Sequence, residues 1–196
     1  MSYLQFGELL ERQSNRISEC TLNKLIDRNY FEKPKSYYDK PLADIYLNVR
    51  NSPVDGNNGR WNGERGNSSW YPDQEFCPGK SNPEGKAWNE ILNKFGIDYI
   101  PFKEGEPDFN RFSKGSVEIN SFSSNRTDNF DKADIEFAKQ KGWSPEEVEL
   151  WRKENRYTWH ECKDMKTMQM VPSEVHNNIP HRGGISEVKK GSGDDL

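Results

Sequence analysis

A chain of 196 residues has room for one domain with an extension, and its composition excludes several classes of protein. The hydrophobic content of 32% is below the roughly 45–50% of an ordinary globular chain. However, 12% of the residues are aromatic and the formal net charge is only −4, whereas disordered chains combine few aromatic residues with a high net charge. We therefore predict a folded domain with a small core and much irregular loop.

The sequence contains no segment that predicts a membrane protein or a disulfide framework. No stretch approaches the ~20 apolar residues of a membrane span, so we expect no membrane insertion by this chain. No signal peptide is visible, and any export is expected to be directed by something outside the chain. The cysteines Cys20, Cys77 and Cys162 are odd in number and show no CxxC spacing, which predicts reduced thiols.

Residues 1–50 are predicted to form a helical N-terminal extension without a catalytic motif. The next segment, residues 51–80, is rich in Gly, Asn, Ser and Pro, which is typical of loops. Because Trp61 and Trp70 lie within it, we expect an ordered loop that packs on a core. The main domain is therefore expected to cover residues 51–196.

Helices and short strands alternate in the middle of the chain, which predicts an α+β fold. Residues with N-capping side chains mark the expected helix starts, and glycines mark the expected stops. The predicted elements are a helix from Asn82 to Gly96, short strands over residues 97–102 and 117–119, a helix over residues 131–141 ended by Gly142, and a helix from Ser144 to about Asn155.

All three histidines of the chain lie in its last quarter. There, two strand-like runs are separated by a polar turn, and a short helix is expected to follow them. The strands are predicted over residues 157–162 and 167–171, with Pro172 at the helix start. This unit brings the candidate site residues together: His160 and Glu161 on the first strand, and His176 and His181 in the helix and at its exit.

A unit of this kind can hold one metal ion. Neutral imidazole is the commonest protein ligand of metals, and carboxylate oxygens suit hard divalent cations. Hydrolysis of a phosphodiester needs a base that activates water and a cation that offsets negative charge, and these side chains can supply both. The spacing leaves a second interpretation open, which is a structural zinc site with Cys162 as the fourth ligand.

The acidic net charge does not favour a phosphate-binding surface, but the charge is unevenly distributed along the chain. Residues 152–190 contain eight cationic and five anionic side chains, so this segment is net positive. Arg182 is a candidate for contact with phosphate. The pair Gly183–Gly184 allows a close approach of the backbone or a sharp turn after the helix.

Several segments of the chain form a recognisable combination. They are Trp61-Asn-Gly-Glu-Arg-Gly-Asn-Ser68, Asn82-Pro-Glu-Gly85, Gly105-Glu-Pro-Asp-Phe109, Trp151-Arg-Lys-Glu-Asn155, Thr158-Trp-His-Glu161, Thr167-Met-Gln-Met-Val-Pro172, His176 and His181-Arg-Gly-Gly184. Taken together, these segments resemble the toxin nucleases of the HNH/endonuclease VII superfamily, whose nearest group carries a Trp-His-His or Trp-His-Glu signature. The similarity extends over roughly residues 50–190, and the combined pattern is far more specific than any single element.

The resemblance implies an HNH-type nuclease domain over residues 51–196, with a ββα-metal motif at about residues 157–184. It implies a DNA endonuclease that uses one divalent cation, such as Mg²⁺, Mn²⁺, Zn²⁺ or Ni²⁺. Relatives are C-terminal pieces of bacterial polymorphic toxins, and an immunity protein neutralises them in the producing cell. We therefore expect a secreted or delivered effector that acts on DNA in the target-cell cytoplasm. A ribonuclease on the same scaffold and a non-catalytic zinc-stabilised interaction domain are the alternatives.

The resemblance also suggests roles for single residues. His160 is expected near the metal, with His176 and His181 as further ligands. Beside the resemblance, we expect Gln169 to orient the base from the second strand. Many relatives have a second histidine, the general base, where this chain has Glu161, so the base is either Glu161 or His160. Consecutive residues on a regular strand point to opposite faces, and both can reach the metal only if the strand ends or bulges there.

Overall fold

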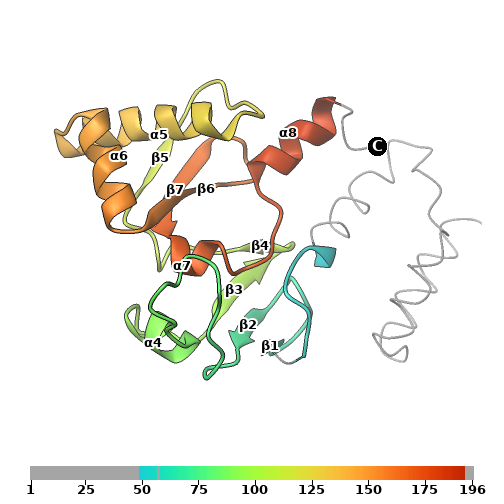
Figure 1. The fold of residues 1–196 in the computed structure, drawn as a ribbon. Helices are drawn as coiled ribbons and strands as arrows, with labels where there is room; N and C mark the ends of the chain where they lie inside the picture. The colour runs from blue at the N-terminus through green and yellow to red at the C-terminus, as the bar shows by residue number, and fades with distance from the viewer. Residues whose placement is uncertain (1–48, 57, 193–196) are drawn as a thin grey trace, which may run out of the picture. The chain divides into compact units, whose positions relative to one another are not determined.

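The computed structural model describes residues 49–56 and 58–192, which form helices and two antiparallel sheets (Figure 1). The predicted α+β class is confirmed. The helices expected within residues 1–48 lie outside the described residues, so the boundary at residue 50 stays a prediction. In the described part of the chain, no helix has both the length and the apolar character that a membrane span needs. Cys77 and Cys162 are free thiols, and Cys20 lies outside the described residues.

The first sheet contains two strands that we had predicted as loop. Within the Gly- and Asn-rich segment, Trp61 lies directly opposite Trp70, and the two buried rings are 5.5 Å apart between centroids. Gly59 permits this hairpin, because a Cβ at that position would overlap the Trp70 ring. The strand order is β1 (Gly59–Trp61), β2 (Ser69–Pro72), β3 (Ile100–Lys103) and β4 (Glu106–Pro107).

The helix α4 (Trp88–Asn93) begins later than the expected start at Asn82. Asn82 does not cap a helix. Its side-chain amide donates to the carbonyl oxygens of Pro78 and Lys86, and its Oδ1 accepts from the Lys86 N–H. These bonds close a loop, and the apolar stripe of α4 then starts at Trp88, which is buried together with Ile91 and Leu92.

The second sheet has the order β5 (Ser116–Glu118), β7 (Thr167–Pro172) and β6 (Tyr157–Glu161), with α5 (Arg126–Lys141) and α6 (Pro145–Glu154) packed against it (Figure 1). The predicted helix start at Ser144, where a capping box forms, and the stop at Gly142, where φ is 69°, are both present. The helix α5 starts before residue 131, because the Asn125 side chain accepts from the backbone N–H groups of Thr127 and Asp128.

Two apolar clusters enclose the C-terminal part of the domain. The first joins the first sheet and α4 to Val171, Val175 and Ile179, and the second lies between the second sheet and α5–α6. In the second cluster, a buried polar network holds β6: Asp134 accepts from the Arg152 guanidinium (2.7 Å) and from the Trp159 indole N–H (2.7 Å). The residue after Trp159 is His160, so both clusters fix the position of the candidate site.

Candidate metal centre

The β6–β7 hairpin and the short helix α7 (Ser173–His176) form the strand, turn, strand and helix that the sequence predicts. The Asp164 carboxylate closes the turn, because it accepts from the backbone N–H groups of Lys166 and Thr167 at 3.0 and 2.8 Å. The backbone N–H of Ser173 donates to the Arg156 carbonyl oxygen at 2.8 Å, which ties the start of α7 to the start of β6. The hairpin therefore positions its histidine against the helix.

The three histidines converge on one point. Nδ1 of His160 lies 3.3 Å from Nε2 of His176, and the ring of His181 lies 5.0 Å from each of the other two rings between centroids. Three ring nitrogens, one from each residue, lie within 4.8 Å of one another. This is the set of metal ligands expected from the sequence, brought together by β6, α7 and the loop after it.

The hydrogen bonds of two of the rings leave lone pairs for a cation. Nδ1 of His181 lies 2.7 Å from the Ile179 carbonyl oxygen, and Nδ1 of His176 lies 3.1 Å from Oδ1 of Asn177. Because both partners are acceptors, both Nδ1 atoms carry the hydrogen, and each Nε2 keeps its lone pair. Backbone and side-chain acceptors commonly fix ligand histidines in this way, so the donor set fits a divalent metal ion.

Burial keeps all three imidazoles neutral. It lowers the pKa of His160 to about 4 and that of His176 to about 3, and it holds the pKa of His181 well below its usual value. The charges of Lys163 and Arg126 add to the effect at His160, and the neighbouring His160 adds to it at His176. Neutral imidazole is the form that binds a metal ion.

Phe109, in the loop after β4, is the apolar floor of this cluster. It is fully buried, and its ring lies 5.0 Å from the His160 ring and 5.7 Å from each of the other two histidine rings between centroids. From the sequence, Phe109 has no expected role beyond its place in the segment Gly105–Phe109. That segment was the signal that could have found it.

Glu161 lies beside the histidine cluster but is not part of it. Its side chain is 4% exposed, and its two oxygens accept separate hydrogen bonds, from Arg126 Nε at 3.0 Å and from Asn129 Nδ2 at 2.8 Å. The strand β6 ends at Glu161, and the side chains of both His160 and Glu161 line the same cavity. In the described part of the chain, the Glu161 carboxylate is not in the group of ligand atoms that the three histidines form. That both consecutive residues reach a metal ion stays a prediction.

The cavity has a volume of about 360 Å³ and includes two cations that the sequence analysis did not select. Arg126 lies at the start of α5, and its side chain remains 65% exposed although it pairs with Glu161. Lys80 lies in the loop before α4. Arg182, the expected phosphate contact, is half-buried and is not among the described residues that line the cavity. Its role stays a prediction.

Gln169 is the cross-strand neighbour of His160 in the β6–β7 register. Its amide Nε2 donates to Oδ1 of Asn110 at 2.8 Å, in the loop that also holds Phe109. The sequence suggested that Gln169 orients the base. The structure places it directly opposite His160, and the expected role itself stays a prediction.

Gly183 and Gly184 are needed because the backbone after His181 approaches the end of β6 closely. A Cβ on Gly183 would lie 2.6 Å from the Glu161 carbonyl oxygen, and a Cβ on Gly184 would lie 2.6 Å from the Cys162 carbonyl oxygen. Gly184 also begins α8 (Gly184–Ser192), a helix that the sequence analysis did not predict. The loop that carries His181 can therefore pack directly on the end of β6.

Residues 100–183 match the family model described as the DNase/tRNase domain of colicin-like bacteriocins. The match covers less than half of the chain, but it includes all three histidines, Glu161 and Arg126. No curated protein matches the chain. The family match supports a nuclease toxin domain of the bacteriocin kind.

Proposed function

We propose that this protein is a divalent-metal-dependent endonuclease of the HNH type that cuts DNA. The observation that carries the proposal is the convergence of His160, His176 and His181, on a hairpin–helix unit inside a segment that matches nuclease toxins. His160 is buried and the other two histidines are half-buried, the rings are neutral, and two of them are held by acceptors on Nδ1. A structural histidine has no need of two similar neighbours at ligand distance.

The three histidines would hold the cation, which when bound offsets negative charge on the scissile phosphate and on the leaving oxygen. Glu161 accepts the proton of the attacking water. A carboxylate has about four lone-pair sites, and the bonds from Arg126 and Asn129 use only part of this capacity.

His160 is the less favoured base. Its Nδ1 faces the ligand cluster, 3.3 Å from His176, so a role as base would remove one of the three metal ligands. Glu161 reaches the same cavity without any such conflict. We therefore assign metal binding to His160 and proton transfer to Glu161.

Two cations at the cavity are suited to the phosphate backbone. The Arg126 guanidinium bonds Glu161 through Nε while most of the side chain faces solvent, and Lys80 contributes a second positive charge to the lining. Contacts to phosphate position a nuclease on its substrate without reading sequence. We expect these two residues to raise affinity for any DNA sequence and to make it sensitive to salt.

We further propose that the protein is an antibacterial effector that is delivered to a target cell and acts in its cytoplasm. The support is the match to a domain of colicin-like bacteriocins and the resemblance to toxin nucleases. The producing cell then needs an immunity protein, and the net positive segment 152–190 predicts an acidic surface on that partner. Expression of the full chain alone in a bacterial cytoplasm should be toxic, and harmless expression would contradict both activity and partner.

A ribonuclease is the second candidate, because the matched family includes tRNases by its description. The third interpretation, a non-catalytic zinc domain with Cys162 as fourth ligand, has less support. In the described part of the chain, Cys162 groups with Glu106 and His160 and not with the other two histidines.

The test is cleavage of supercoiled plasmid and of tRNA, in parallel, with and without excess EDTA. We expect plasmid nicking that stops in EDTA and returns when Mg²⁺, Mn²⁺, Zn²⁺ or Ni²⁺ is added. Cleavage of tRNA but not of plasmid would identify RNA as the substrate and would leave the metal-dependent mechanism unchanged. Undiminished cutting in EDTA would refute the metal-dependent mechanism. Failure to cut either substrate with any of the metals would favour the non-catalytic zinc-stabilised interaction domain.

A further inference from the structure

The imidazole of His160 has two nitrogens in different surroundings. The side chain is 1% exposed, and Nδ1 faces the ligand cluster, 3.3 Å from Nε2 of His176. Nε2 points to the opposite side, where it is buried and has no hydrogen-bond partner among the described residues. A carboxylate oxygen of Glu106 lies 3.8 Å from this nitrogen.

A neutral imidazole has one N–H, and its position decides whether His160 can bind a cation. If the hydrogen is on Nδ1, it can be donated to Nε2 of His176, and both of these nitrogens are then unavailable to a metal ion. If the hydrogen is on Nε2, the lone pairs of both rings face the cluster. The second tautomer leaves a buried N–H that needs an acceptor.

We propose that Glu106 is a positioning residue that holds His160 in the tautomer with hydrogen on Nε2, and so keeps Nδ1 open for the metal. This inference rests on the proposed function, because it assigns a role toward the same cation. At 3.8 Å the contact is longer than a hydrogen bond, and the carboxylate acts through its negative charge on the N–H dipole. Carboxylates that orient ligand histidines from behind are a general feature of protein metal sites.

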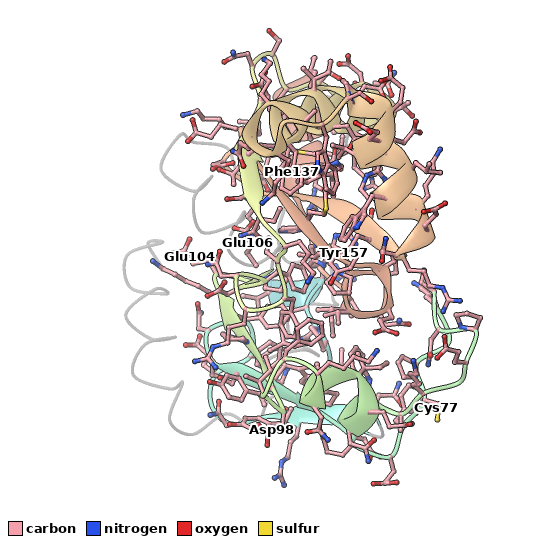
Figure 2. The ribbon with its side chains drawn as sticks, turned by 90° about the vertical axis from the view of Figure 1, so that its left-hand side faces the viewer. Cys77, Asp98, Glu104, Glu106, Phe137 and Tyr157 are labelled. Carbon is pink, nitrogen blue, oxygen red and sulfur yellow. The ribbon has the colours of Figure 1, made fainter. Side chains whose placement is uncertain are left out.

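The surroundings of Glu106 support a fixed carboxylate. Its Oε1 accepts from the backbone N–H of Lys163 at 2.9 Å, and the Lys163 ammonium donates to the Glu104 carbonyl oxygen at 2.8 Å. The β3–β4 hairpin is thereby attached to the β6–β7 turn. Figure 2 shows Glu104 and Glu106 on the same side of the molecule. The contact with Nε2 of His160 is made by Glu106.

Glu106, His160 and Cys162 also have ligand atoms within 4.8 Å of one another, so a soft cation could bind behind His160 instead. This arrangement would use Nε2 as a ligand and would need the Cys162 sulfur. If the cation binds behind His160, removal of the Cys162 thiol should weaken metal binding. If Glu106 only positions His160, removal of the thiol should leave metal affinity unchanged.

The experiment uses the full chain and four variants: Glu106→Ala, Glu106→Gln, the charge-matched control Glu104→Gln, and Cys162→Ala. The histidine tautomers are measured by ¹⁵N NMR without metal, which is practical because the chain has three histidines. Zn²⁺ and Mn²⁺ affinities are measured by calorimetry. Thermal melts show which variants are folded. If Glu106→Ala does not fold, the more conservative Glu106→Gln takes its place.

We expect His160 of the wild type to carry its hydrogen on Nε2, and Glu106→Ala to shift it toward Nδ1. Metal affinity should fall about tenfold to a hundredfold in Glu106→Ala, and less in Glu106→Gln, which keeps an oxygen acceptor. Glu104→Gln and Cys162→Ala should match the wild type.

An unchanged tautomer in Glu106→Ala would overturn the proposal, and so would a loss of Zn²⁺ binding in Cys162→Ala as large as that in Glu106→Ala. The tautomer is read in the absence of metal, so it decides the role of Glu106 even if the wild type cuts nothing. A wild-type protein that binds no metal ion would refute the proposed function, and the tautomer measurement would still test whether Glu106 positions His160.

Discussion

The substitution Glu161→Gln tests the assignment of the general base. It keeps the shape of the side chain and removes the proton acceptor, which typically lowers the rate about 10²–10⁴-fold. Metal affinity should change little, because Glu161 is not among the residues whose ligand atoms group with His176 and His181.

The contacts of Glu161 predict a modest loss of stability. An amide has one oxygen, so it can accept from either Asn129 or Arg126 but not from both in the present arrangement. The buried Asn129 is expected to keep the oxygen, and the mostly exposed Arg126 can turn to water. Loss of one such bond costs about 1 kcal/mol, so the variant should remain folded.

The assay is single-turnover plasmid nicking at saturating metal, with metal affinity and thermal unfolding measured on the same preparations. Arg126→Gln is the matched control, because it removes the partner of Glu161 and leaves the carboxylate in place. Its main effect should be weaker, less salt-dependent DNA binding. A Glu161→Gln protein within about tenfold of the wild-type rate would be typical of an orienting residue, and it would refute Glu161 as the base.

Three further predictions concern the metal ligands and their support. His176→Ala and His181→Ala should each weaken metal binding in calorimetry, with nicking partly restored at high metal concentration; activity lost equally at every concentration would argue for a direct catalytic role. Phe109→Ala should lower the free energy of unfolding by about 3–5 kcal/mol in denaturant titrations, and an unchanged midpoint would show that the cluster needs no apolar floor. Asp134→Ala leaves the buried Arg152 guanidinium without its carboxylate, which should cost about 3–5 kcal/mol; a loss below about 1 kcal/mol, typical of an exposed pair, would contradict the buried network.

The sequence alone was sufficient where the relevant contacts are local. The capping box at Ser144 and the stop at Gly142 act within a few residues, and both were predicted correctly. His160, His176 and His181 lie close together on β6, α7 and the loop after it, as their spacing predicts, and their role as metal ligands stays a prediction. Their convergence could therefore be expected from spacing.

Local signals were misleading at Asn82 and in the segment that contains Trp61 and Trp70. Asn82 has the sequence features of a helix cap, but its amide is used to close a loop. The hairpin of Trp61 and Trp70 lies in a segment with loop composition, and the packing of the Trp61 ring on Trp70 and on Phe102 from β3 stabilises it as a strand pair. Burial of large rings outweighed the local preference of glycine and asparagine for turns.

The surroundings of the candidate metal ligands were decided only by the tertiary structure. Glu106 and Phe109 come from the β3–β4 hairpin and its exit, and Arg126 comes from the start of α5, far from the histidines in sequence. No periodicity or spacing relates these segments, because their contacts depend on how the two sheets and α5 pack around β6. The sequence by itself determined which residues can bind a metal ion, while packing between distant segments determined what buries, orients and charges them.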